Sequence, residues 1–159
     1  MSLLTPMLRS SPLTDWFSDA QRVQGMLDFE AALAQAQAAC GMVPPEAVGP
    51  IVAACRHEAI DFAALGEAAV GAGNLAIPLV KQLTAQVKAQ DPEAARYVHW
   101  GATSQDAIDT GLVLQLRGAL DAAETLLEQL LAALALQADR YRDTVMPGRT
   151  WMQHALPVT

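Results

Sequence analysis

The sequence predicts an all-α protein with two parts. A small N-terminal helical domain is expected over residues 1–104, and residues 105–159 are expected to form the incomplete start of a central helix bundle. Hydrophobic residues make up 52% of the chain but aromatic residues only 5%, so the core is built mainly from alanine and leucine, which favour helices. Helix-start and helix-stop residues recur along the chain, and no strand-like alternation of polar and apolar residues stands out.

The first helix is predicted to begin after Ser18. In the segment SDAQ, the Ser18 hydroxyl can accept a hydrogen bond from a free backbone N–H of the first turn. The Gln21 side chain can in turn accept one from the backbone N–H of Ser18. Gly41 supplies the left-handed residue that ends this helix near residue 40. An apolar stripe along the helix is interrupted by Glu30. We expect Glu30 to bond across a helix contact rather than to act in catalysis.

Three shorter helical segments are predicted next. One begins around Pro45, because a proline in the first turn removes no helical hydrogen bond. Asp61 is expected to cap another, and the segment GAGN at residues 71–74 breaks the chain before a helix with Pro78 in its first turn. A further helical turn in DPEAARYV then leads to the polar segment HWGATSQD at residues 99–106.

The longest predicted helix covers about residues 105–141. Apolar residues recur along it at steps of three and four, which is the pattern of a coiled-coil seam. At 1.5 Å per residue the helix is roughly 50 Å long, and further leucines lie away from the seam. Such a helix must pack against residues beyond the N-terminal part or against other chains. The seam consists of Val113, Leu116, Leu120, Ala123, Leu127, Leu130 and Leu134.

Composition and charge argue against several classes of protein. The formal net charge of −7 argues against a nucleic-acid-binding protein, which needs a basic face. No uncharged apolar run is long enough to cross a membrane and no secretory leader is recognised, so we expect a cytoplasmic protein. Cys40 and Cys55 are expected to be small buried hydrophobes. His57, His99 and His154 lack the spacing of metal ligands, and we expect no metal or other cofactor.

Polar residues gather directly before the longest helix. Gly101 lets the backbone bend, and Thr103 with Asp106 makes a T-x-x-D capping box. Capping explains one hydroxyl and one carboxylate, but it does not explain the adjacent Ser104 or the preceding His99. A helix N-terminus with free N–H groups and two hydroxyls also suits a carboxylate, and a histidine beside it can contribute charge or a proton. On the residues alone, the cap and the anion site are equally good interpretations.

Two further segments offer polar side chains. Asn74 precedes the helix that contains Pro78, and it can either lie in a plain loop, which is the simpler interpretation, or direct its amide at a ligand. In GRTWMQH, Arg149 and Thr150 follow a glycine at a predicted helix start, and His154 lies beyond them. A lone arginine is usually a solvated charge, but this arrangement also suits bidentate binding of a carboxylate.

Two long strings carry a family resemblance. HWGATSQDAIDTGLVLQLR and GRTWMQHALPVT resemble the first and second signature blocks of the fumarase/aspartase/adenylosuccinate lyase superfamily. The resemblance implies an all-helical homotetramer in which long helices form a central bundle and each active site combines blocks from three subunits. It implies a catalytic group of His99, Thr103 and Ser104. The substrate-binding group that it implies is Asn74, Arg149, Thr150, Trp151 and His154.

Departures from the superfamily pattern narrow the expected activity. Trp151 stands where the lyases have a histidine for acid–base chemistry, and Asn74 stands where adenylosuccinate lyases have another. The resemblance therefore favours a cycloisomerase of aromatic-compound breakdown. Such an enzyme adds a carboxylate oxygen of a small tricarboxylate to a double bond of the same molecule, which is the reverse of a β-elimination. The alternatives are another lyase, such as an adenylosuccinate lyase, and a non-catalytic helical oligomerisation module.

The catalytic serine of the superfamily lies in a mobile loop with the motif Gly-Ser-Ser-x-Met-Pro-x-Lys-x-Asn. This sequence contains no such string, and members of the superfamily are much longer than 159 residues. We therefore expect the chain to be the N-terminal part of a longer protein, and we expect it to be inactive alone.

Overall fold

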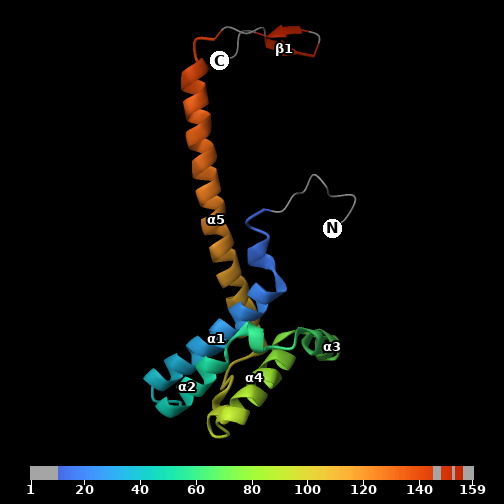
Figure 1. Ribbon diagram of the computed structural model, residues 1–159, viewed down its shortest axis with the longest axis vertical. Coiled ribbons are helices and arrows are strands. Elements are labelled where there is room, and N and C mark those ends of the chain that lie inside the picture. The colour runs from blue at the N-terminus through green and yellow to red at the C-terminus, as the bar shows by residue number, and fades with distance from the viewer. Residues whose placement is uncertain (1–10, 145–147, 152, 156–159) are drawn as a thin grey trace. The chain divides into compact units, whose positions relative to one another are not determined.

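The computed structural model describes residues 11–144, 148–151 and 153–155. Within these ranges the ordered elements are helices, apart from a hairpin of two short strands, so the prediction of an all-α protein is confirmed (Figure 1). The chain forms two compact units, Met1–Ala119 and Leu120–Thr159. The division between these units falls inside the longest helix, and the domain boundary expected between residues 104 and 105 stays a prediction.

Five α-helices follow one another along the described residues. They are α1 (Asp19–Ala39), α2 (Pro45–Ala54), α3 (Phe62–Ala72), α4 (Ala76–Gln90) and α5 (Ser104–Tyr141). Three short 3-10 turns accompany them, and these are η1 (Asp15–Phe17), η2 (His57–Ala59) and η3 (Ala94–Tyr97). The strands β1 (Gly148–Thr150) and β2 (Gln153–Ala155) pair antiparallel. The sequence predicts a helix start in the segment that forms β1, and that prediction is wrong.

The hairpin has a short turn with a left-handed residue. Thr150 pairs with Gln153, which leaves two residues in the turn. Trp151, the first of these two, has φ 54°. Two-residue turns whose twist matches that of the flanking strands use positive φ values at such positions. A helix starting here would need Trp151 in the right-handed conformation instead.

The helix boundaries follow capping residues that the sequence indicates. Ser18 Oγ accepts the Gln21 N–H at 3.3 Å at the start of α1. The second half of the predicted box is not formed, because the Ser18 N–H donates to the Asp15 carbonyl at 3.2 Å. Asp61 caps α3 with a bond of 3.0 Å from a backbone N–H. Gly41, just after α1, has φ 71°, as expected for a residue that ends a helix.

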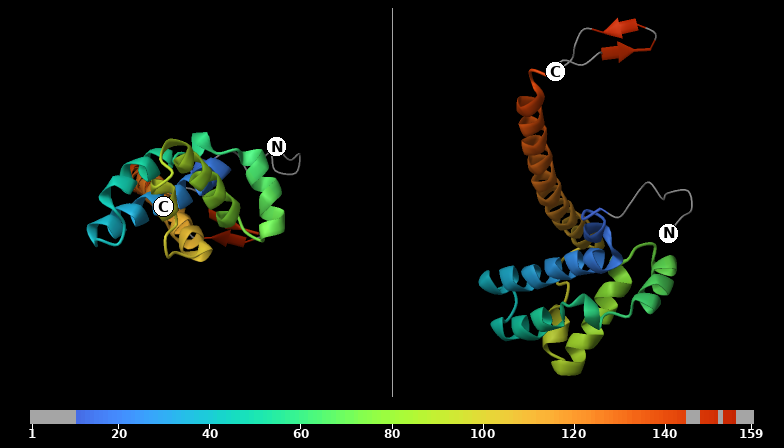
Figure 2. Two further views of the ribbon diagram at one scale, coloured as in Figure 1. Left: turned by 90° about the horizontal axis from the view of Figure 1, so that it is seen from below. Right: turned by 45° about the horizontal axis from the view of Figure 1, so that its top comes forward.

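The core of the first unit lies between α1, α2 and α4. Helices α1 and α2 run side by side, and α4 packs against α2 and α3 (Figure 2). Glu30 is the only charged residue among the buried ones in the described part of the chain. The largest fully buried side chains are Leu27, Ile51, Leu65, Leu79, Leu83, Glu30, Val43 and Val87.

Helices α1 and α5 touch at two glycines. A Cβ atom on Gly25 would lie 2.8 Å from the carbonyl oxygen of Gly111, and one on Gly111 would lie 2.9 Å from the backbone nitrogen of Met26. Real Cβ atoms are essentially never this close to other heavy atoms, so the two backbones are in direct contact. Glycine is needed at both positions because a side chain at either one would push the helices apart.

The segment before α1 is held against α5 by Trp16. The Gln115 side chain of α5 is buried, and its Nε2 donates to the Trp16 carbonyl at 2.7 Å. A Cβ atom on Gly118 would overlap the Trp16 ring. The indole therefore packs directly against the backbone of α5 through the space that this glycine leaves.

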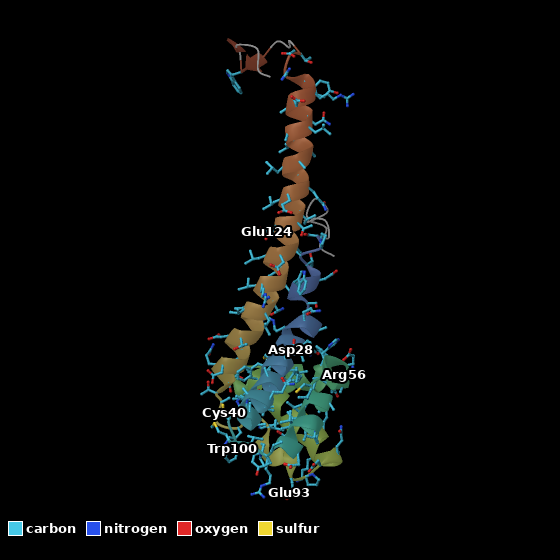
Figure 3. The ribbon with its side chains drawn as sticks, turned by 90° about the vertical axis from the view of Figure 1, so that its left-hand side faces the viewer. Asp28, Cys40, Arg56, Glu93, Trp100 and Glu124 are labelled. Carbon is cyan, nitrogen blue, oxygen red and sulfur yellow. The ribbon has the colours of Figure 1, made fainter. Side chains whose placement is uncertain are left out.

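The second unit contains the C-terminal part of α5 and the hairpin. Large apolar side chains project into solvent from this part of the helix, in the region where Glu124 is labelled in Figure 3. Leu127 is 63% exposed and Leu131 is 69% exposed. No helix in the described residues is long and apolar enough to cross a membrane. The exposed large apolar residues of this stretch are Leu120, Leu126, Leu127, Leu130, Leu131, Leu134, Leu136 and Tyr141.

The two cysteines differ in exposure. Cys55 is buried after the end of α2, as predicted, and burial together with the charges of Glu30 and Asp28 raises the pKa of its thiol to about 12. Cys40 is exposed at the end of α1, so the prediction that it is buried is wrong (Figure 3). It follows the last residue of the helix and lies outside the buried stripe of α1.

Gly111→Ala should destabilise the chain. The added methyl group meets the backbone of Met26. Overpacking of this kind costs about 1–3 kcal/mol, which is more than the ~1 kcal/mol that alanine gains over glycine inside a helix. The matched control is Gly66→Ala in α3, where a Cβ atom meets nothing within 4 Å and the change should be neutral or stabilising. Urea denaturation followed by circular dichroism measures both variants, and equal stabilities would contradict the direct backbone contact.

Candidate active site

The segment between η3 and α5 is a tight turn with two left-handed residues. His99 has φ 57° and Gly101 has φ 70°. Glycine adopts this conformation freely, but for other residues it is a strained conformation that costs about 1–3 kcal/mol. The Ala102 N–H donates to the His99 carbonyl at 3.4 Å. Contacts from other parts of the chain must therefore stabilise His99 in this conformation.

A buried carboxylate provides one such contact. His99 Nδ1 lies 2.6 Å from Glu30 Oε1. The Glu30 side chain is 1% exposed and the His99 side chain 16% exposed. Burial raises the pKa of Glu30, and the hydrogen bond and charge of His99 oppose that rise. Glu30 thus bonds from α1 to the turn before α5, whereas the sequence predicts a bond across a contact between helices.

A second polar side chain of α1 holds the same turn. Gln37 Nε2 donates to the Trp100 carbonyl at 2.7 Å. Glu30 and Gln37 are seven positions apart, so they lie on the same face of α1. Sequence reasoning missed the Gln37 contact. The available signal was a second polar residue on the face of the helix that is otherwise apolar.

Thr103 and Asp106 form the predicted capping box. Asp106 Oδ2 accepts the Thr103 N–H at 2.8 Å and the Thr103 hydroxyl at 3.0 Å. In return, the Asp106 N–H donates to Thr103 Oγ1 at 3.4 Å. The backbone hydrogen bond from Thr103, followed by the one from its hydroxyl, lowers the pKa of Asp106 below its ordinary value. The Thr103 hydroxyl is therefore engaged in the cap, and the cap carries a negative charge.

Ser104 is the first residue of α5, and its side chain is partly exposed. Among the described residues its hydroxyl makes no hydrogen bond. The first backbone N–H groups of a helix have no partner within the helix. The Asp106 N–H already donates to Thr103. The Ser104 hydroxyl and the N–H groups of Ser104 and Gln105 are therefore the donors at this turn that are available to an anion.

Asn74 lies at the start of α4. Its Oδ1 accepts the Ile77 N–H at 3.1 Å, so Asn74 caps that helix. It also lines a cavity of about 280 Å³ between α1, α4 and α5. No hydrogen bond in the part of the chain that the structure describes joins Asn74 to the turn before α5. The other residues that line the cavity are Arg22, Met26, Leu75, Ile108, Leu112 and Gln115.

The remaining predicted site residues belong to the hairpin. Arg149 lies opposite His154 in the register of β1 and β2, and Thr150 pairs with Gln153. Trp151 is 98% exposed in the turn between the strands. The side chains of Arg149, Thr150 and His154 lie outside the described part of the structure. Their assignment as substrate-binding residues stays a prediction.

Comparison with known proteins identifies the family to which this chain belongs. A family of lyases matches residues 8–159. The chain belongs to this lyase family. It is 61% identical over 150 residues, 94% of its length, to the 3-carboxy-cis,cis-muconate cycloisomerase of Pseudomonas aeruginosa. It is 56% identical over 156 residues, 98% of its length, to the enzyme of the same name from Bradyrhizobium diazoefficiens.

Solved structures agree with the sequence matches. The crystal structure of 3-carboxy-cis,cis-muconate lactonizing enzyme from Pseudomonas putida matches 98% of this chain with a TM-score of 0.93 and 54% identity. This chain spans about a third of the length of these relatives, since the matches cover 33% and 35% of the two curated proteins and 36% of the crystallised chain. The resemblance drawn from the signature blocks is confirmed for the family and for the fold.

Replacing Glu30 by glutamine should remove a pH-dependent contribution to stability. The pKa of Glu30 in the folded chain is raised above its ordinary value of 4.5, so the folded state binds this proton more tightly than the unfolded state. That contribution is fully present below the unfolded pKa and is lost as the pH rises through the folded pKa. The free energy of unfolding of the wild type minus that of Glu30→Gln should therefore fall as the pH rises above about 4.5. Urea denaturation at a series of pH values measures the free energy of unfolding of both proteins. A wild-type minus Glu30→Gln difference that grows with pH would contradict the raised pKa.

Proposed function

We propose that this chain is the N-terminal part of a 3-carboxy-cis,cis-muconate cycloisomerase. Such an enzyme converts 3-carboxy-cis,cis-muconate to 4-carboxymuconolactone in the breakdown of protocatechuate through the β-ketoadipate pathway. The proposal rests on the identity of 56% and 61% over nearly the whole chain to relatives with this name. Trp151 and Asn74 support it, because lyases of the superfamily that release amines have histidines at these positions.

The proposed reaction forms a carbon–oxygen bond within one molecule. A carboxylate oxygen of the substrate adds to an activated carbon–carbon double bond, and a proton goes to the neighbouring carbon, so that a lactone results. Negative charge accumulates in the transition state on another carboxylate of the substrate, as an aci-carboxylate. Preorganised hydrogen-bond donors aimed at that carboxylate lower the barrier.

We assign this electrostatic role to the start of α5. The Ser104 hydroxyl and the first N–H groups of the helix can donate to a carboxylate, and the helix dipole favours an anion there. His99 would bind or polarise the substrate. Thr103 would act beside Ser104, although its hydroxyl is already shared with the Asp106 carboxylate. The proposal involves no metal or organic cofactor, and it keeps the three polar hairpin residues as substrate-binding groups.

Ser104→Ala and Thr103→Val should each lower turnover in the longer protein. The loss of one donor to a developing oxyanion costs about 10²–10³ in kcat in well-studied cases, so we expect a loss of at least about tenfold. Thr103→Val should also lower the stability by about 1 kcal/mol, because the cap of α5 loses its hydroxyl. The disappearance of the ultraviolet absorbance of the muconate measures turnover.

The matched control for these variants is Ser18→Ala. It also removes a hydroxyl from a helix start, but from the cap of α1, so it should lower stability and leave turnover unchanged. Unchanged turnover in both Ser104→Ala and Thr103→Val would remove the proposed anion site and favour a plain cap. Turnover of adenylosuccinate would instead favour another lyase of the family. The 159-residue chain alone should give no absorbance change, because it lacks the serine loop of the superfamily.

We further propose that the longer protein is a homo-oligomer, a tetramer by the family resemblance, and that α5 lies in its interface. The support is the row of exposed leucines in the second unit, because a contiguous apolar surface of this kind usually marks an association site. The double variant Leu127→Glu/Leu134→Glu should lower the molar mass in analytical ultracentrifugation. Thr125→Glu, an exposed position away from the seam, is the matched control and should leave the mass unchanged. The same mass for both variants would contradict an interface along this seam.

A further inference from the structure

We propose that Glu30 is a positioning residue that fixes the tautomer of His99, with the proton on Nδ1 and with Nε2 left as the hydrogen-bond acceptor. Neither residue of this pair serves to begin α5, which has its own cap in Thr103 and Asp106. The proposal deepens the proposed function, and it rests on that function in so far as His99 serves the reaction.

The bond itself selects the tautomer. The 2.6 Å between His99 Nδ1 and Glu30 Oε1 is a short, charge-assisted distance. When Glu30 is ionised, its carboxylate accepts hydrogen bonds and cannot donate, so Nδ1 must then carry the hydrogen of this bond. A neutral imidazole has only one N–H, and the lone pair is then on Nε2. In the opposite tautomer, two acceptor atoms would face each other at this distance.

Burial makes this selection strong. The Glu30 side chain is 1% exposed, so water does not compete for Oε1. Among the described residues, His99 is the only hydrogen-bond partner of this carboxylate, and Glu30 Oε2 has none. A buried carboxylate with only one hydrogen bond contributes little to stability. The free-energy cost of removing a buried ion pair from water offsets most of the attraction between its two charges. The arrangement instead gives a fixed orientation to one ring.

The backbone adds to this orientation. His99 is held at φ 57°, a conformation that is strained for a residue with a side chain. Gln37, on the same face of α1 as Glu30, binds the carbonyl of the following residue at 2.7 Å. The ring of His99 and the backbone next to it are thus held by two side chains of one helix, while the ring stays 16% exposed.

The chain contains a contrasting pair that serves as a control. His57 Nδ1 lies 3.6 Å from Glu58 Oε2, with the two side chains 31% and 72% exposed. His57 Nδ1 also lies 3.1 Å from Gln24 Oε1. The contact with Glu58 is longer and open to water, so it imposes no tautomer of its own. Glu58→Gln therefore matches Glu30→Gln in chemistry but should not affect His99.

Nitrogen NMR of the 159-residue chain tests the tautomer without any assay of activity. Long-range ¹H–¹⁵N spectra at a pH where the ring is neutral should show His99 with Nδ1 protonated and Nε2 bare. Glu30→Gln should move the population toward the other tautomer, because an amide can donate as well as accept, and Glu58→Gln should leave the His99 shifts unchanged. If Glu30→Gln does not fold, Glu30→Asp, which withdraws the carboxylate by one methylene, should change the shifts instead. A wild-type His99 protonated on Nε2, or His99 shifts that are the same in the Glu30 variant and the wild type, would overturn the proposal.

Kinetics of the longer protein test the consequence. In metal sites, loss of the partner that orients a ligating histidine costs about 10–100-fold, and we expect a comparable effect on an oriented histidine here. Glu30→Gln should therefore lower kcat by about that factor and leave KM nearly unchanged. If the wild type is active and Glu30→Gln has the same kcat, the positioning role of Glu30 is overturned and the proposed function is left intact. A wild type that does not consume the muconate would overturn the proposed function, and the NMR result would still decide the tautomer.

Discussion

The direct contact between the backbones of α1 and α5 is the constraint on which the first unit depends. Gly25 and Gly111 leave no room for a side chain where the two helices meet, so their backbones are in direct contact at this point. Because α1 is fixed against α5 in this way, residues farther along α1 reach the turn from which α5 begins. Glu30 and Gln37 bind that turn at two successive residues. The geometry of the candidate site is therefore set by packing rather than by the site residues themselves.

Helix α1 combines two kinds of contact on its buried surface. Its apolar residues pack in the core of the first unit, while its two buried polar residues face the loop that carries a strained histidine. Ordinary core packing would be served better by apolar residues at those two positions. The polar pair instead couples the stability of the first unit to the conformation of a few residues at a helix start, where the proposed chemistry takes place.

Local features of the fold were predictable from the sequence, and distant contacts were not. The caps at Ser18 and Asp61 join residues three positions apart, so their spacing is visible in the sequence itself. Glu30 and His99 are 69 positions apart, and nothing in one sequence pairs them. The hairpin was missed because its turn needs a tryptophan at positive φ, which residue preferences disfavour. The family resemblance supplied candidate site residues that spacing alone would not have singled out.

The unequal surroundings of the two cysteines have a practical consequence. A thiol reacts with an alkylating reagent as the thiolate, and the Cys55 thiol is both buried and, with its pKa of about 12, protonated at neutral pH. Cys40 is exposed at the end of α1, three positions after Gln37, whose side chain donates a hydrogen bond to the Trp100 carbonyl. The native chain thus offers a single attachment point for a fluorescent dye, next to the segment that leads into the candidate site.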